Sequence, residues 1–188
     1  MKPILLIFVA LVATLLLSSC SSTNSTPTAS KLVPKGPFCA VHKKHPVPIP
    51  KCGGMRVRTT AYTHTEADSL QYGTKTAAGS HLRYDNVRSA AADWSRFPYG
   101  TIFRIKGEKN VYQIDDYGSA LVGTNTIDLY KPSMGSMNAW GVRNVEIQIV
   151  RWGSYKKSLT IMKERTRAKH VHSMVASIQS KLRRAGTL

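Results

Sequence analysis

Three aspartates, Asp115, Asp116 and Asp128, lie within the segment QIDDYGSALVGTNTIDLY at residues 113–130. Neighbouring side chains of a strand point to opposite faces, so Asp115 and Asp116 cannot both enter one groove. Asp128 lies in a short apolar run, where burial would oppose ionisation of its carboxyl group. A carboxylic acid that keeps its proton near neutral pH can act as a general acid. The structural alternative is that each aspartate caps a turn or pairs with an arginine.

The elements that must position these acids read as short strands. Apolar and polar residues alternate along 55–62 and 145–150, which predicts two half-buried strands. Further strand-like runs at 103–106, 111–116 and 126–130 are separated by turn residues such as Gly, Pro and Asn. Short strands at this spacing predict a mainly β fold, a small barrel with a single core.

Two helical segments are expected beside the strands. Residues 133–140, followed by Gly141, predict one short helix, and we expect Trp94 and Trp140 to be core residues rather than sugar platforms. Residues 154–188 read as a basic amphipathic helix. Its apolar face can pack on the barrel, lie on anionic lipid or contact a wall polymer.

The formal charge of +17 is concentrated on the flanks of the chain. Residues 1–53 carry six basic and no acidic side chains, and residues 151–188 carry ten basic and one acidic. The middle, 54–150, is nearly neutral, with eleven basic and nine acidic side chains. The charge alone allows nucleic acid, anionic lipid or cell-wall polymer as a partner.

The N-terminus predicts export, because Lys2 precedes an apolar run over 4–17 that is short for a membrane span. The stretch Leu17-Ser18-Ser19-Cys20 resembles a bacterial lipobox. We therefore expect residues 1–19 to be a lipoprotein signal peptide and Cys20 to be lipidated, which anchors the chain stably. The alternative is a plain secretory signal with a chance cysteine. Ser21 suggests an outer-membrane lipoprotein facing the periplasm, and an exported protein does not normally meet nucleic acid.

The next segments are expected to connect the anchor to the barrel. Residues 20–37 are rich in Ser, Thr and Pro and read as a flexible tether. In residues 38–54, Cys39 and Cys52 remain as a pair that an oxidising envelope would join in a disulfide. The alternative is a metal site that adds His42 or His45, but that spacing is a weak zinc signal.

Four motifs follow each other in order: TTAYT at 59–63, AADWSRFPYGT at 91–101, DYGSALVG at 116–123 and TIDLY at 126–130. Together they resemble the three-aspartate (3D) domain, which is similar to the catalytic core of the membrane-bound lytic transglycosylase A family. The resemblance implies a double-psi β-barrel, here over 55–153, that acts on peptidoglycan without a cofactor. It places the three named aspartates at Asp93, Asp116 and Asp128, with Asp128 as the catalytic acid.

Two departures from that family pattern concern the site. Asp116-Tyr117-Gly118-Ser119 stands where the family has Asp-Thr-Gly-Gly, and one extra residue precedes Asp128. That residue either forms a bulge or turns Asp128 to the other face.

Other expected site residues lie on the same motifs. Tyr62 and Thr76 match substrate-contacting stretches of the family, although both could be core or surface residues. The turn at Gly118 and Ser119 can bring backbone N–H groups to a ligand. A metal site at His64, Glu66 and Asp68 is the less favoured interpretation of a polar loop, so no metal is expected.

The expected function is that of a lytic transglycosylase, a monomer that cleaves peptidoglycan glycan strands. By resemblance, one carboxyl group, Asp128, cleaves the bond between N-acetylmuramic acid and N-acetylglucosamine and leaves a 1,6-anhydro sugar, while Asp116 and Asp93 shape its protonation and the sugar subsite. Two alternatives are a non-catalytic, expansin-like wall-binding barrel and an aspartic peptidase. A peptidase needs two facing copies of its Asp-containing turn, and this chain offers one.

Overall fold

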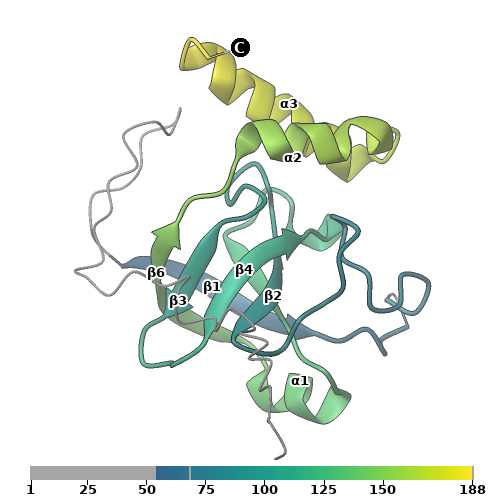
Figure 1. Cartoon of the computed structure of the whole chain (residues 1–188), viewed down its shortest axis with the longest axis vertical. Helices are drawn as coiled ribbons and strands as arrows, with labels where there is room; N and C mark the ends of the chain where they lie inside the picture. The colour runs from purple at the N-terminus through teal and green to yellow at the C-terminus, as the bar shows by residue number, and fades with distance from the viewer. Residues whose placement is uncertain (1–53, 68, 188) are drawn as a thin grey trace, which may run out of the picture.

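The computed structural model describes residues 54–67 and 69–187. Its six strands form a closed barrel in the order β1-β5-β2-β4-β3-β6, and each strand is paired on both sides (Figure 1). This architecture confirms the mainly β fold and the small double-psi β-barrel expected from the sequence. The strands are β1 (Met55–Tyr62), β2 (Val87–Ala92), β3 (Ile102–Ile105), β4 (Val111–Asp116), β5 (Thr126–Tyr130) and β6 (Arg143–Arg151).

β2 is the strand that the sequence did not predict. Its residues, VRSAAA, show no alternation of apolar and polar types, and the last four are all buried. Such a strand lacks the two-residue period by which a half-buried strand is found. It nevertheless pairs with β4 in parallel and with β5 antiparallel, so it joins the two strands that carry Asp116 and Asp128.

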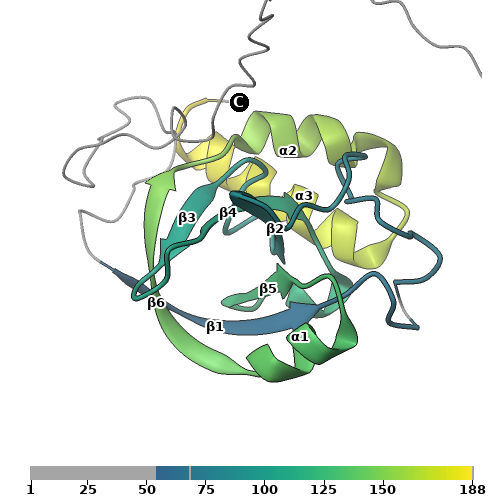
Figure 2. The same cartoon turned by 60° about the horizontal axis from the view of Figure 1, so that its bottom comes forward.

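The helices lie on two sides of the barrel. They are α1 (Met134–Trp140), α2 (Tyr155–Met162) and α3 (Lys169–Arg184), with short 3-10 helices η2 (Ser119–Leu121) and η3 (Lys163–Arg165). Figures 1 and 2 show α1 on one side and the α2–α3 pair on the other. Among the described residues, none of these helices has both the length and the apolar character needed to cross a bilayer.

α1 begins and ends as its sequence predicts. Ser133 caps its N-terminus, with the Ser133 hydroxyl accepting the Ser136 N–H and the Ser136 hydroxyl accepting the Ser133 N–H. Gly141, at φ +61°, ends it. Trp140 is 8% exposed and Trp94 is fully buried, which confirms both as core residues.

The C-terminal extension forms two helices rather than the single one expected. Polar residues 163–167 interrupt the apolar periodicity, and the chain turns there through η3. The apolar face packs on the barrel, because Val171, Met174, Ile178 and Leu182 are at most 1% exposed within the same core cluster as barrel residues. Of the three surroundings considered for this face, packing on the barrel is therefore the observed one.

Gly153 lies where the barrel passes into this extension. Its N–H donates to the Thr101 hydroxyl at 3.0 Å, and the next N–H, of Ser154, donates to the Tyr99 carbonyl at 3.0 Å. A Cβ on residue 153 would lie 2.2 Å from the Tyr99 carbonyl oxygen and 2.3 Å from that of Pro98. The approach of the two backbones is thus too close for any side chain at this position.

Candidate active site on the wall of strands β1 and β5

Strands β1 and β5 run parallel and bring four polar side chains to one face of the barrel wall. Thr60 is opposite Asp128 and Tyr62 is opposite Tyr130 in the strand register. Residues two apart on a strand share a face, so these four side chains lie together. The Thr60 hydroxyl donates to Asp128 Oδ1 at 2.6 Å. This bond fixes one oxygen of the carboxyl group.

β5 continues through Asp128 without a bulge. The pairings of Asp128 with Thr60 and Ala91 continue the regular registers of β5, without a shift in either. Gly123, at φ +81°, supplies the left-handed conformation in the preceding turn. The Asp128 side chain therefore stays on the face of Thr60 and Tyr130.

The shift of register lies in β4 instead. Ala90 is opposite Ile114 and Ala91 is opposite Asp116, so Asp115 is the bulged residue. Asp115 is 1% exposed, and its Oδ2 accepts bonds from Arg83 at 3.0 Å and Ser89 at 2.8 Å. It is thus held apart from the partners of Asp116.

Asp116 is tied to the β1 wall through Tyr62. Its Oδ1 accepts the backbone N–H groups of Ala77 at 2.8 Å and Tyr117 at 2.9 Å. Its Oδ2 accepts the Tyr62 hydroxyl at 3.2 Å. Tyr62 thus links the two acids of the site, because it is bonded to Asp116 and lies two residues along β1 from Thr60, which is bonded to Asp128.

The pKa of the Asp128 carboxyl is closer to neutral pH than that of an ordinary aspartate. The pKa of this carboxyl is raised from 3.8 to about 6, chiefly by burial. The negative charges of Glu66 and Asp116 also raise it, whereas the hydrogen bond from Thr60 and the positive charge of Arg58 lower it. Burial also raises the pKa of Asp116, against its bonds from Ala77, Tyr117 and Tyr62. The pKa of Tyr62 lies well above its ordinary value because of burial and the nearby carboxylates, so its hydroxyl keeps its proton and donates it.

Aromatic side chains that were not predicted as site residues continue this face. The Tyr130 hydroxyl is bonded to His64 Nδ1 at 2.9 Å, and the Tyr130 ring lies 5.7 Å from that of Tyr62 and 6.4 Å from that of Tyr84. Thr60 was missed in the same way. The signal for Thr60 and Tyr130 was present, since each is two residues from a predicted site residue on a predicted strand.

Asp93 has a different environment from the other two named aspartates. It is 1% exposed in the turn after β2, and its two oxygens accept the N–H groups of Ser95 at 2.7 Å and Gly123 at 2.8 Å. Its charge acts on Tyr155 and Lys181 of the C-terminal helices. The next residue, Trp94, donates its indole N–H to the Asp116 carbonyl at 2.8 Å. Asp93 therefore holds a turn that contacts the end of β4.

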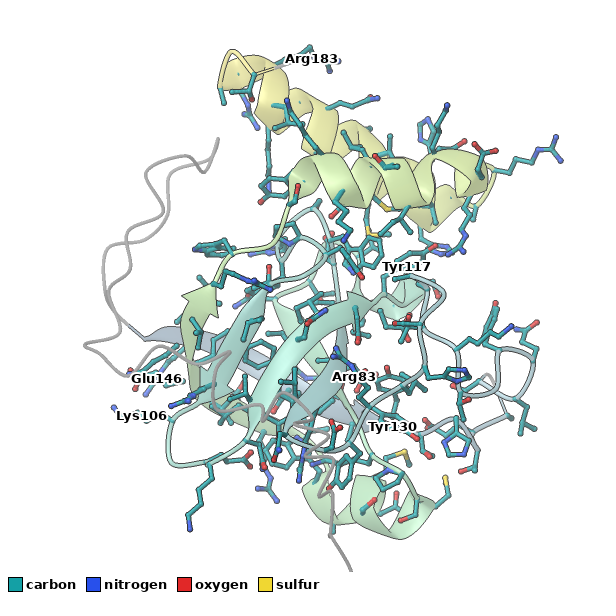
Figure 3. The ribbon with its side chains drawn as sticks, in the orientation of Figure 1. Arg83, Lys106, Tyr117, Tyr130, Glu146 and Arg183 are labelled. Carbon is teal, nitrogen blue, oxygen red and sulfur yellow. The ribbon has the colours of Figure 1, made fainter. Side chains whose placement is uncertain are left out.

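The remaining expected substrate-binding residues lie near Asp116 in sequence or in space. Thr76 is 5% exposed and its hydroxyl is bonded to Ser80 at 3.0 Å, while the N–H of the following Ala77 reaches Asp116. Gly118 caps η2 and Ser119 is exposed at its first position. Figure 3 shows the neighbouring Tyr117 beneath the α2–α3 pair and Tyr130 on the side toward α1, so the site lies between the helical regions.

The polar side chains of the loop after β1 make hydrogen bonds within that loop and to Tyr130. Glu66 accepts the Thr63 N–H at 2.9 Å, and His64 binds Tyr130 as above. Among residues 54–67 and 69–187, no three His, Cys, Asp or Glu side chains gather closely enough to hold a metal ion. Asp68, and with it that part of the metal interpretation, lies outside the described residues.

The N-terminal predictions also fall outside the described residues. They are the signal peptide, the lipidated Cys20, the tether and the Cys39–Cys52 disulfide. They remain predictions from the sequence.

A comparison with protein-family models matches residues 88–151 to the 3D domain. No curated protein matches the chain. The matched segment runs from the second residue of β2 to the end of β6 and contains Asp93, Asp116 and Asp128, while Thr60 and Tyr62 on β1 lie outside it. The 3D domain is found in lytic transglycosylase-like and other peptidoglycan-acting proteins, and it suggests a peptidoglycan-related enzyme. Residues 88–151 of this chain are thus a 3D domain, carried on a closed barrel whose β1 and β5 form the wall that holds Asp128.

Proposed function

We propose that this protein is a peptidoglycan lytic transglycosylase in which Asp128 is the single acid and base. The observation that carries the proposal is the carboxyl of Asp128, whose pKa is raised to about 6 on a wall shared with Thr60 and Tyr62. A group with this pKa exchanges its proton readily at near-neutral pH. The 3D domain supplies the substrate class, since it occurs in peptidoglycan-acting proteins.

The reaction needs one group that first gives and then takes a proton. Protonated Asp128 gives its proton to the glycosidic oxygen between N-acetylmuramic acid and N-acetylglucosamine as the bond to the anomeric carbon breaks. The carboxylate then takes the proton of the C6 hydroxyl, whose oxygen bonds to the anomeric carbon of the same muramic residue. The product is a 1,6-anhydro ring, no water is consumed, and Asp128 returns to its protonated form.

The neighbouring side chains have supporting roles in this proposal. Thr60 orients the Asp128 carboxyl by its 2.6 Å bond. Asp116 keeps negative charge nearby, which raises the pKa of Asp128, and Tyr62 fixes Asp116 to the same wall. Thr76, Gly118 and Ser119 border Asp116 and would contact the sugar chain. Asp93 acts on this site through the turn that bonds Trp94 to the end of β4.

The test is digestion of purified sacculi, with the soluble products identified by mass spectrometry. We expect anhydromuramic ends from the wild-type protein and a loss of about 100-fold to 10,000-fold for Asp128→Asn, the range for removal of a general acid. Asp85→Asn is the matched control, because Asp85 is exposed in the loop before β2. Reducing ends would indicate a hydrolase, and cut peptides a peptidase. Retention on sacculi without products would favour a wall-binding barrel. Full activity of Asp128→Asn would remove Asp128 from the role.

We also propose that the protein is exported and held in the outer membrane by lipid on Cys20, facing the periplasm as a monomer. The support is the apolar run over 4–17 followed by Ser18-Ser19-Cys20. A tether of Ser, Thr and Pro residues would let the barrel reach the peptidoglycan layer. Mass spectrometry of the protein from cells tests this proposal, since an unmodified Cys20 would contradict it.

A further inference from the structure

The C-terminal extension reaches the acid site through Arg165. This residue ends η3, between α2 and α3, and lies outside the segment matched to the 3D domain. Its guanidinium Nη1 donates to the Ala77 carbonyl oxygen. The contact joins two segments that are 88 positions apart in the sequence. It is therefore a tertiary contact of the extension with the loop between β1 and β2.

Ala77 lies at a tight turn of that loop. The Thr76 N–H donates to the Ser80 carbonyl at 2.8 Å, and the Leu82 N–H donates to that of Thr74 at 2.8 Å. The Ala77 N–H donates to Asp116 Oδ1 at 2.8 Å. Arg165 and Asp116 thus hold the same residue by its carbonyl and its N–H. A shift of the Ala77 backbone would remove a donor from Asp116.

The extension itself is firmly placed against the barrel. Its apolar face is buried in the common core, and the Tyr99 N–H donates to the Ser158 hydroxyl at 2.9 Å. The Lys181 ammonium group donates to the Ser95 carbonyl oxygen. The ring of His170, near the start of α3, lies 5.9 Å from that of Tyr117, the residue after Asp116. Arg165 therefore acts from a fixed support.

Charge gives a second link between Arg165 and the site. Burial raises the pKa of Asp116, while the bonds from Ala77, Tyr117 and Tyr62 and the positive charge of Arg165 lower it. The other titratable groups that act in this region are Asp115 on the same strand, Asp128 on β5 and Tyr62 on β1. Loss of the guanidinium group would leave Asp116 more readily protonated.

We propose that Arg165 is a positioning residue of the acid site, which holds the Ala77 backbone against Asp116 and so makes the C-terminal extension part of the active-site structure. The proposal rests on the proposed function only for its effect on catalysis. The clamp of Ala77 between Arg165 and Asp116 is a property of the fold and can be tested separately.

The experiment compares Arg165→Gln and Arg165→Lys with Arg167→Gln in the full chain. Arg167 is an exposed arginine two positions away and serves as the matched control. Carboxyl carbon NMR of labelled aspartates measures the pKa of Asp116, and amide hydrogen exchange measures protection of Ala77. We expect Arg165→Gln to raise the pKa of Asp116, because one positive charge that favours its carboxylate is lost. We expect the Ala77 amide to exchange about 10-fold faster, since local opening governs its protection.

The two other variants separate charge from shape. Arg165→Lys keeps the positive charge, so we expect the pKa of Asp116 to stay near its wild-type value. Arg167→Gln should change neither reading. If Arg165→Gln leaves both the Asp116 titration and the Ala77 exchange rate unchanged, the clamp is wrong.

Sacculus digestion then links the clamp to catalysis. We expect kcat of Arg165→Gln to fall about 3- to 10-fold with KM little changed, because misplacing the site costs turnover rather than binding. An unchanged kcat together with altered NMR and exchange would overturn the positioning role. Altered NMR and exchange in a protein that releases no anhydro products would instead contradict the proposed function and leave the clamp standing.

Discussion

Asp93 and Asp128 are the same residue type on the same barrel, but their surroundings differ in the number and kind of hydrogen-bond donors. Asp93 is 1% exposed and receives a backbone N–H on each oxygen. Asp128 is half-buried and receives the Thr60 hydroxyl on one oxygen, with Glu66 and Asp116 adding repulsion. Donors from the backbone stabilise a carboxylate, whereas burial with few donors favours the protonated acid. The first arrangement is suited to holding a turn and the second to transferring a proton.

The sharpest way to break this comparison is to make the same substitution in both places. Asp93→Asn puts an amide NH₂ group opposite the N–H of Ser95 or Gly123, so one buried donor loses its acceptor. We expect the free energy of unfolding to fall by about 2 to 3 kcal/mol. Asp128→Asn keeps an oxygen that can accept the Thr60 hydroxyl, so we expect no such loss. Denaturant unfolding of the two variants measures the difference, and equal stability of Asp93→Asn and wild type would contradict it.

The pH dependence of stability sharpens the comparison further. Because the folded pKa of Asp128, about 6, lies above its ordinary 3.8, the folded state binds this proton more tightly than the unfolded state. Stability from this group is therefore present at low pH and is lost as pH rises from about 4 through 6. Allowing for partial solvation, wild type should lose about 1 to 2 kcal/mol over this range relative to Asp128→Asn.

Urea unfolding at pH 4 and pH 7 measures this difference. Asp115 and Asp116 also have raised pKa values, so the wild-type curve alone would mix their contributions with that of Asp128. Subtracting the Asp128→Asn curve isolates the group of interest. Parallel curves for the two proteins would mean that the pKa of Asp128 is the same in the folded and the unfolded state.

The smallest expected effect concerns the hydrogen bond that the Thr60 hydroxyl donates to Asp128. Thr60→Val keeps the shape of the side chain and removes the donor that lowers the pKa of Asp128. We expect that pKa to rise by about 0.5, so the alkaline limb of sacculus digestion moves to higher pH. Thr160→Val on α2, where the hydroxyl bonds the Lys156 carbonyl, is the control. A limb that does not move, or that moves to lower pH, would contradict the role of Thr60.

The strands that the sequence predicted are those with one buried and one solvated face or with flanking turn residues. β2 was not predicted, because its Ala-rich end is buried on both faces and so shows no alternation of apolar and polar residues. Alanine is also uncommon in strands and favours helices. The C-terminal segment was predicted as one helix because its apolar spacing continues on both sides of 163–167. The break follows from the polar residues in that interval and from packing two helices on one barrel.

The site was predictable where it follows strand period and motif. Asp116, Asp128 and Tyr62 lie on predicted strands and meet on one wall. The pairing of Ala77 with Asp116 could not be predicted, because it joins a backbone N–H in an irregular loop to a strand 39 positions away. Arg165 is similar, since nothing in its own segment indicates that it reaches that loop. Contacts of this kind depend on the tertiary arrangement, which local sequence does not encode.

Gly153 has a consequence for how the extension can move. With the carbonyl oxygens of Pro98 and Tyr99 within 2.3 Å of where a Cβ would stand, and with its own N–H bonded to Thr101, residue 153 lies tightly against the barrel. Any larger residue would wedge the helical pair away from the strands and draw Arg165 off its loop. We therefore expect the barrel and its C-terminal helices to move as one rigid body rather than about a hinge at residue 153.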